Sequence, residues 1–420
     1  MTHDLAREET VIFSSKKSHP ISGSVRPDFE LVRQEFIRNF EARGEQGAAC
    51  AIFFRGTKVV DLWGGYQCQI AKKKWSDQTM SVAFSVTKGM AAAAMVVAHS
   101  QGMFELDRPV SQYWPEFARH GKERITVREL LSHQAGLITV EPSLSAEELR
   151  DHDQLAETLA DQKTHWKPGT RHGYHTLTLG WYQNELLRRT DPKQRTLGQF
   201  FQEEIAERLG VDFFIGLPEH VPEERLSNVQ GYHRLAVLGH LNQLPPMMVL
   251  SGIWPRSLVS KSIRTLPISN PADVGGPEYR HVEIPSANGI GQARAIAKIY
   301  DVLARGGSDL GINPSTWNEL VARPSVPPAG SRDAILKLDT NYGFGFSRPS
   351  QGFAFGTDSS AFGCPGIGGS FGMADPSAEL GFSYLTNTLS FRIFDDPREQ
   401  AVRRACYQCI ENLQYQRRAA

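Results

Sequence analysis

The chain of 420 residues lacks long apolar runs and contains little cysteine. No stretch approaches the roughly 18 consecutive apolar residues of a membrane-spanning helix, so we expect no transmembrane segment. The first twenty residues include Asp4, Glu8 and Glu9 and only a three-residue apolar run at 11–13, which does not fit a secretory signal. The five cysteines form an odd set without framework spacing, which is typical of a reducing compartment. We therefore expect a cytoplasmic protein.

The chain also lacks an excess of charge of either sign. Its 46 basic and 46 acidic side chains cancel, and no long run of one sign occurs, so we expect neither a nucleic-acid nor a membrane partner. The 13 histidines lack ligand spacing, and the pair Cys406 and Cys409 has no second pair and lies in an amphipathic pattern. We therefore expect no metal and no cofactor, and predict that these cysteines pack on a helix face.

Hydrophobic periodicity predicts strands near both ends of the chain and helices between them. Helices are predicted at 29–42, 127–131, 177–189, 293–304 and 397–413, and strands at 48–54, 58–63, 342–346, 370–374 and 380–386. The first two strands would be joined by a tight turn at 55–56. Glycine and proline are frequent between 244 and 277, which indicates an excursion loop near a pocket.

These elements predict an α/β protein of the α+β kind. One mainly antiparallel sheet would be built from both ends of the chain and covered by the terminal helices, with the helical middle as a second lobe. We expect a single unit over 1–420, with a sheet lobe of about 28–80 and 290–415 and a helical lobe of about 81–289. A ligand cleft is expected between the lobes. The oligomeric state is not predicted.

Ser85 and Lys88 lie three positions apart, where an extended segment gives way to a helix that we expect to begin near Gly89. Positions i and i+3 share a helix face, so the Lys88 amine can reach the Ser85 hydroxyl and activate it as a nucleophile. The small residues that follow would let this helix pack deep inside the protein. In the alternative interpretation, Ser85 only caps the helix and Lys88 is solvated.

Three further segments could complete an acyl-transfer site, which needs a proton shuttle and donors for an oxyanion. Residues 166–176 form a turn-rich approach that delivers Tyr174 to the start of a helix. Residues 362–372 are rich in glycine, which permits close approach of the backbone to a ligand. Residues 125–137 contain a short helix and a glycine stop. We expect His133 and His175 to be hydrogen-bonded structural or pocket-lining groups rather than catalysts.

Together these segments resemble the serine β-lactamase and penicillin-binding-protein superfamily, specifically the class C β-lactamase-like carboxylesterases. The resemblance runs from about residue 47 to 411. It rests on four motifs, which are Phe-Ser-Val-Thr-Lys-Gly at 84–89, the segment 130–137, Pro-Gly-Thr at 168–170 leading to Gly-Tyr-His at 173–175, and Gly-Ile-Gly-Gly-Ser at 366–370. It implies a β-lactamase/transpeptidase-like fold, with Ser85 as the acylated nucleophile, Lys88 as its proton partner and Tyr174 as the base. It also implies an oxyanion hole from the backbone N–H groups of Ser85 and Ile367.

Two departures from the family pattern bear on the substrate. Where the family carries Lys-Thr-Gly or His-x-Gly, this chain has Cys364-Pro365-Gly366, so no cation is available to bind a substrate carboxylate. Thr176 stands where an asparagine is usual, which removes an amide that would bind an acylamino group. Both changes favour small uncharged esters over penicillins and peptides. We expect substrate contacts from His175, Thr176, Cys364 and Gly366.

Tyrosine and lysine titrate near 10 and 10.4, so neither is a base at neutral pH unless its surroundings lower its pKa. A cation at Lys88 would favour tyrosinate at Tyr174, and the two groups should titrate as a pair, which leaves the identity of the base open. The predicted function is hydrolysis of carboxylic esters through an acyl-enzyme on Ser85. The alternatives are transfer of the acyl group to another alcohol, weak activity on β-lactams or D-peptides, and a scaffold that has lost its chemistry.

A second candidate nucleophile is Ser370, because residues 368–372 match the Gly-x-Ser-x-Gly pattern of α/β-hydrolases. That fold needs a helix directly after the serine and a histidine later in the chain. Here Ala-Asp-Pro follows at 374–376, and no histidine occurs after His281. We therefore interpret Ser370 as part of a tight strand.

Overall fold

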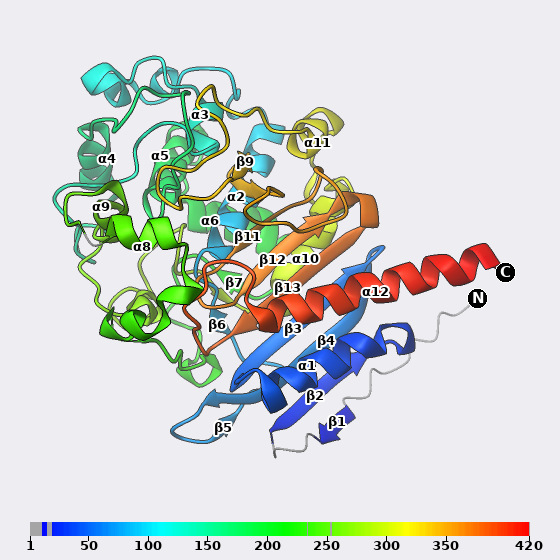
Figure 1. Cartoon of the computed structure of the whole chain (residues 1–420). Coiled ribbons are helices and arrows are strands. Elements are labelled where there is room, and N and C mark those ends of the chain that lie inside the picture. Colours follow the sequence, from blue (N-terminus) through cyan, green and yellow to red (C-terminus); the bar gives the residue numbers. More distant parts are fainter. Residues whose placement is uncertain (1–10, 15–18, 233, 253, 420) are drawn as a thin grey trace.

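Both ends of the chain contribute to one antiparallel sheet in this computed structural model, which describes residues 11–14, 19–232, 234–252 and 254–419 (Figure 1). β5 (Lys73–Lys74) pairs with β4 beside the main path. The order across the sheet is β1 (Val11–Ser14), β2 (Pro20–Val25), β4 (Thr57–Cys68), β3 (Gly47–Phe54), β13 (Leu380–Thr386), β12 (Phe371–Asp375), β11 (Phe362–Pro365), β10 (Phe346–Arg348) and β9 (Asn341–Gly343). The predicted origin of the sheet from the two chain ends is confirmed.

Helices cover both faces of this sheet. α1 (Glu30–Ala42) and α12 (Pro397–Ala419) contact each other on one face, while α10 (Ala293–Ala304) packs on β13, β3 and β12 (Figure 1). Apolar residues of α1, α12 and the strands form one continuous core, which includes Phe36, Cys406 and Cys409. The cysteine pair thus packs on a helix face, as predicted. Among the described residues no three His, Cys, Asp or Glu side chains are grouped to hold a metal ion.

The middle of the chain is mainly helical. Its helices are α2 (Val86–Ser100), α3 (Val127–Leu131), α4 (His152–Ala160), α5 (Thr178–Thr190), α6 (Leu197–Phe201), α7 (Glu207–Leu209), α8 (Pro246–Gly252) and α9 (Leu258–Ile263), and α11 (Pro314–Val321) follows α10. A second, small sheet has the order β6 (Ser81–Val82), β8 (Ile290–Gly291) and β7 (Phe213–Phe214). In the described parts of the chain, no helix has the length and apolar character needed to cross a bilayer.

Most predicted elements agree with the structure to within a few residues, but one strand is wrong. Residues 342–346 are not a single strand, because the backbone reverses at Phe344 and Gly345 and leaves β9 and β10 as a short hairpin. Both residues have positive φ, at 58° and 89°. Gly345 adopts this conformation without strain, whereas Phe344 requires support from its surroundings.

Helix α2 lies in the core because its residues are small on the side that faces the sheet. Val86 to Ala98 are all buried, and α2 contacts β10, β11 and β12. A Cβ atom at Gly89 would lie 2.0 Å from the Tyr300 hydroxyl oxygen of α10, so only glycine permits this approach. The close packing fixes the first turn of α2, which carries Ser85 and Lys88.

We predict that Gly89→Ala destabilises the protein by about 1–3 kcal/mol, because the added methyl group overpacks a filled core. The Tyr300 hydroxyl is buried without a hydrogen-bond partner, so Tyr300→Phe alone should be nearly neutral. In the Tyr300→Phe background Gly89→Ala should lower the free energy of unfolding by less, since the nearest remaining atom of the ring lies 3.1 Å from the new Cβ. Urea denaturation of the four proteins measures this coupling, and additive effects would contradict it.

Candidate active site

The Ser85 hydroxyl is not used to cap helix α2. Ser85 has helical backbone angles, φ −65° and ψ −9°, and its side chain makes no capping hydrogen bond. The preceding Phe84 has φ +49°, an unfavourable conformation for a side chain of this size. Ser85 is partly exposed to a cavity while Val86 onward is buried. The sharp turn thus presents a free hydroxyl at the end of a rigid helix, against the capping interpretation.

Lys88 is fully buried beneath this hydroxyl, against the interpretation as a solvated lysine. Its Nζ lies 3.2 Å from Ser85 Oγ and donates to the backbone carbonyls of Thr176 at 2.7 Å and Ser286 at 2.8 Å. Burial disfavours the charged form and lowers the Lys88 pKa to about 8. A neutral amine has two N–H bonds, which the carbonyls can accept, so its lone pair would face Ser85.

Tyr174 lies on the other side of Ser85, just before α5. Its hydroxyl is hydrogen-bonded to Ser85, and Lys88 Nζ lies 4.9 Å from the centre of its ring. Desolvation raises the Tyr174 pKa well above 10, an effect larger than the opposing hydrogen bond from Ser85. The expectation that Lys88 would favour a tyrosinate is therefore not met. Burial therefore lowers the pKa of Lys88 and raises the pKa of Tyr174.

The backbone N–H groups of Ser85 and Ile367 are available to a ligand. Their chain neighbours donate within the protein, as Val86 does to Ala83 and Gly366 does to Ser370. For the N–H groups of Ser85 and Ile367 themselves, the described residues supply no acceptor. Both residues line the same cavity. These N–H groups are the kind of donors that stabilise an oxyanion.

His133 and His175 hold the backbone around Tyr174 in place. His133 Nδ1 accepts the N–H of His175 at 3.0 Å, and its carbonyl accepts the N–H of Gly173 at 2.9 Å. The Nε2 atom of His175 in turn accepts the N–H of Leu137 at 3.2 Å. Burial lowers the pKa of both rings, for His175 to about 3, so both act as neutral acceptors. This agrees with the structural role expected for them.

Of the four expected substrate contacts, the structure places only Thr176 on the cavity wall. His175 is fully buried behind the wall. The Cys364 side chain is also buried, packed toward Lys88, Gly89 and Ser347 at the base of α2. A Cβ at Gly366 would lie 2.8 Å from the carbonyl oxygen of Ala83, so this glycine allows β11 to approach the nucleophile turn. These three positions shape the site from behind and do not line the cavity.

Three residues that the sequence analysis missed hold the reacting groups. The first is Ser286, whose carbonyl accepts a hydrogen bond from Lys88. The second is Asp333, whose buried carboxylate accepts the N–H of Tyr174, two further N–H groups at 2.7 and 2.8 Å, and the Tyr342 hydroxyl at 3.2 Å. The third is Arg398. Buried Arg398 donates to the Gly368 carbonyl at 2.7 Å and thereby fixes the loop of Ile367. All three contacts link segments far apart in the chain, so no local pattern indicates them.

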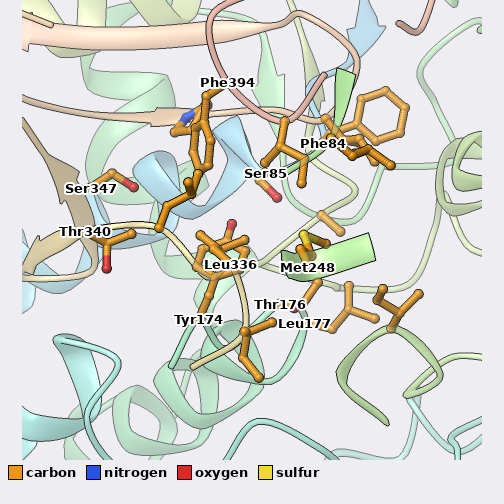
Figure 2. A pocket seen from close by; sticks show the side chains of 18 of the residues that line it. Phe84, Ser85, Tyr174, Thr176, Leu177, Met248, Leu336, Thr340, Ser347 and Phe394 are labelled. Atoms are coloured by element: carbon orange, nitrogen blue, oxygen red, sulfur yellow. The ribbon is translucent and has the colours of Figure 1, made fainter. Parts of the chain in front are cut away.

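The groups around Ser85 open into a mainly apolar cavity of about 460 Å³ between the sheet and the helical lobe. Figure 2 shows Ser85 and Tyr174 directed toward the same space, with Met248 of α8 beside Thr176 and Leu177. The predicted excursion loop thus forms part of the wall, and it contains α8 and α9. The charged side chains lining the cavity are those of Arg264, Asp339 and Arg348. Buried Arg348 donates to several backbone carbonyls, including that of Ser360 at 2.8 Å.

Comparisons with known proteins agree with this geometry. A family model described as Beta-lactamase matches residues 34–405. Esterase/beta-lactamase LipL of Mycobacterium tuberculosis is 30% identical over 395 residues, covering 88% of this chain and 83% of LipL. The crystal structure of a family VIII carboxylesterase has a TM-score of 0.80 and 33% identity over 93% of this chain and 99% of its own. The crystal structure of a penicillin-binding protein homologue from Caulobacter crescentus has a TM-score of 0.78 and 32% identity, covering 93% of this chain and 99% of its own.

The chain therefore belongs to the beta-lactamase family, and both the resemblance and the fold class expected from the sequence are confirmed.

We predict that Asp333→Asn lowers the free energy of unfolding by about 1–3 kcal/mol, because the amide places a donor where the carboxylate has an acceptor. Tyr342→Phe is the matched control, since it removes one donor and leaves the carboxylate intact, and should cost about 1 kcal/mol or less. Urea denaturation measures both. An Asp333→Asn protein as stable as the parent would show that Tyr174 does not depend on this carboxylate.

Proposed function

We propose that the protein is a serine hydrolase that cleaves carboxylic esters through an acyl-enzyme on Ser85. The observation that carries this proposal is the placement of a free hydroxyl between a buried amine and a phenol, at the wall of an apolar cavity. Membership of the beta-lactamase family and similarity to a family VIII carboxylesterase support it. A scaffold that had lost its chemistry would need neither the low pKa of Lys88 nor the hydrogen bond of Tyr174 to Ser85.

In the first half-reaction, Ser85 Oγ attacks the ester carbonyl carbon while its proton moves to the lone pair of Lys88 Nζ. The carbonyl oxygen becomes an oxyanion, held by the N–H groups of Ser85 and Ile367. When the bond to the alcohol oxygen breaks, that oxygen takes the proton of the Tyr174 hydroxyl, and Lys88 returns its proton to Tyr174. The products are the free alcohol, an acyl-Ser85 ester and a neutral amine.

In the second half-reaction, water attacks the acyl carbon and gives its proton to Lys88. Collapse of the second tetrahedral intermediate breaks the bond to Ser85 Oγ, this oxygen takes the proton back from Lys88, and the carboxylic acid leaves. Another alcohol could replace water by the same steps and would give acyl transfer. The lowered pKa of Lys88 and the raised pKa of Tyr174 support Lys88 as the base and Tyr174 as the proton donor of this mechanism.

The cavity favours uncharged esters with an apolar acyl or alcohol group. Its walls are largely aliphatic and aromatic, and the cation nearest the interior, Arg348, is occupied by backbone carbonyls. A substrate carboxylate would thus lose its hydration against apolar walls, and the unpaired cation of the lining, Arg264, is exposed to solvent, where its charge is screened. β-Lactam hydrolysis is expected only as a weak side activity.

We predict that Ser85→Ala abolishes both turnover of a nitrophenyl ester and labelling by a fluorophosphonate, because the acylated oxygen is lost. The parent protein should gain one adduct mass on the peptide that contains Ser85, as measured by mass spectrometry. Ser370→Ala is the control and should keep labelling, since this serine is buried just before β12 and does not line the cavity. Absence of labelling and turnover in the parent would favour the scaffold.

We predict that kcat/KM rises with pH and levels off above an apparent pKa near 8, because Lys88 must lose its proton to accept that of Ser85. Tyr174→Phe should lower the plateau by about 10²- to 10⁴-fold, the usual contribution of a general acid–base group, and keep the inflection. Initial rates between pH 6 and 10.5 measure both. A rate that climbs past pH 10 in the parent would instead make Tyr174 the base.

A further inference from the structure

Exposed apolar side chains are concentrated in residues 241–263. Among the described residues, eight large apolar side chains are exposed, and five of them lie between 241 and 263. These five, which we call the apolar patch, are Leu241, Met247, Leu250, Trp254 and Ile263, with exposed fractions of 39%, 51%, 55%, 69% and 45%. Burying such side chains is favourable, so a concentration of this kind marks an interaction surface.

The apolar patch is continuous with the cavity of Ser85. Helix α8 directs Met248 into the cavity, while Met247 and Leu250 of the same helix are exposed (Figure 2). Helix α9 ends at Ile263, which belongs to both the patch and the cavity wall. The segment from α8 to α9 therefore has apolar side chains both in the cavity wall and on the outer surface.

The segment that carries the patch contains charged residues of one sign. Residues 226–272 contain four Lys or Arg and no Asp or Glu, although the whole chain is balanced at 46 of each. Lys261 is paired with Glu141 at 2.9 Å. Arg256 and Arg264 are exposed, and neither forms an ion pair within the described parts of the chain. An apolar surface with unpaired cations beside it is complementary to an anionic amphiphile surface.

We propose that the apolar patch binds the surface of an anionic lipid bilayer. The side chains of Met247, Leu250 and Trp254 enter the headgroup boundary, and Arg256 and Arg264 contact the anionic headgroups. A second copy of the chain is a poorer occupant, because a two-fold interface would bring these arginines face to face. The balanced net charge predicted no membrane partner, but it hides the local asymmetry of 226–272.

This location has a consequence for the substrate, which rests on the proposed function. An apolar ester dissolved in the bilayer would leave it next to the segment that lines the cavity and need not cross water. Amphiphilic esters carried by an anionic bilayer are thus the substrate class that the patch selects.

The test measures vesicle binding in the absence of substrate, so its outcome does not depend on whether the protein is a hydrolase. Ser85→Ala protein is mixed with phosphatidylcholine vesicles that contain or lack about 30% phosphatidylglycerol, and bound protein is measured by co-sedimentation. Anionic vesicles should bind it, and high salt should weaken the binding. The substitutions Met247→Ser, Leu250→Ser and Trp254→Ser together should reduce the affinity by about tenfold or more.

Two matched variants separate the contributions. Arg256→Gln should weaken binding to anionic vesicles by about fivefold, the effect of one basic residue near such a surface. Tyr415→Ser removes another exposed aromatic residue, 76% exposed near the end of α12 and remote from α8 in Figure 1, and should change nothing. Short soluble esters should be hydrolysed equally by the triple variant and the parent, because the three side chains do not line the cavity.

Three results would overturn the proposal. They are the absence of binding to anionic vesicles, binding that the triple variant leaves unchanged, and a dimer that dissociates in the triple variant while vesicles bind neither protein. The last would identify a second copy of the chain as the occupant of the patch.

Discussion

The burial of one amine governs the rest of the site. Lys88 is enclosed by protein, and desolvation lowers its pKa to about 8, so near neutral pH an appreciable fraction is uncharged. The carbonyls of Thr176 and Ser286 accept its N–H bonds and orient it toward Ser85. This arrangement requires that the first turn of α2 lie in the core, which in turn requires a glycine where α2 meets Tyr300. The reactivity of the serine thus follows from packing.

Each reacting group is held by a buried polar contact from a distant part of the chain. Asp333 holds the backbone of Tyr174, and Arg398 holds the loop of Ile367. Arg398 is itself paired with Asp396 at 2.9 Å and Glu45 at 3.2 Å, so both ends of the chain contribute to the oxyanion side of the cavity. Because buried polar groups are costly to leave unpaired, each contact allows little displacement.

The elements that could be predicted are those whose signals are local. The helix at 127–131 agrees to the residue with its prediction from hydrophobic periodicity, and in the structure Thr126 and Glu129 form a capping box at its start. The strand at 380–386 agrees with its prediction from a short β-rich segment, and all of its residues are buried in the structure. The hairpin at 342–346 was not predicted, because the positive φ of Phe344 depends on its surroundings. Ser85, Lys88 and Tyr174 were expected from motifs, whereas Asp333 and Arg398 act only through tertiary contacts and leave no local pattern.

The same burial that activates Ser85 also separates this site from one built for anionic substrates. Cys364, at the place where the family pattern has lysine or histidine, is packed behind the wall and adds no charge to the cavity. If Lys88 must be neutral to act as base, it cannot also bind a substrate carboxylate, and Arg348 is occupied by backbone carbonyls. A negative group entering the cavity would therefore raise the pKa of Lys88 and oppose the proton transfer that the reaction needs. In the proposed mechanism, selectivity for uncharged esters and activation of Ser85 are thus two consequences of one buried amine.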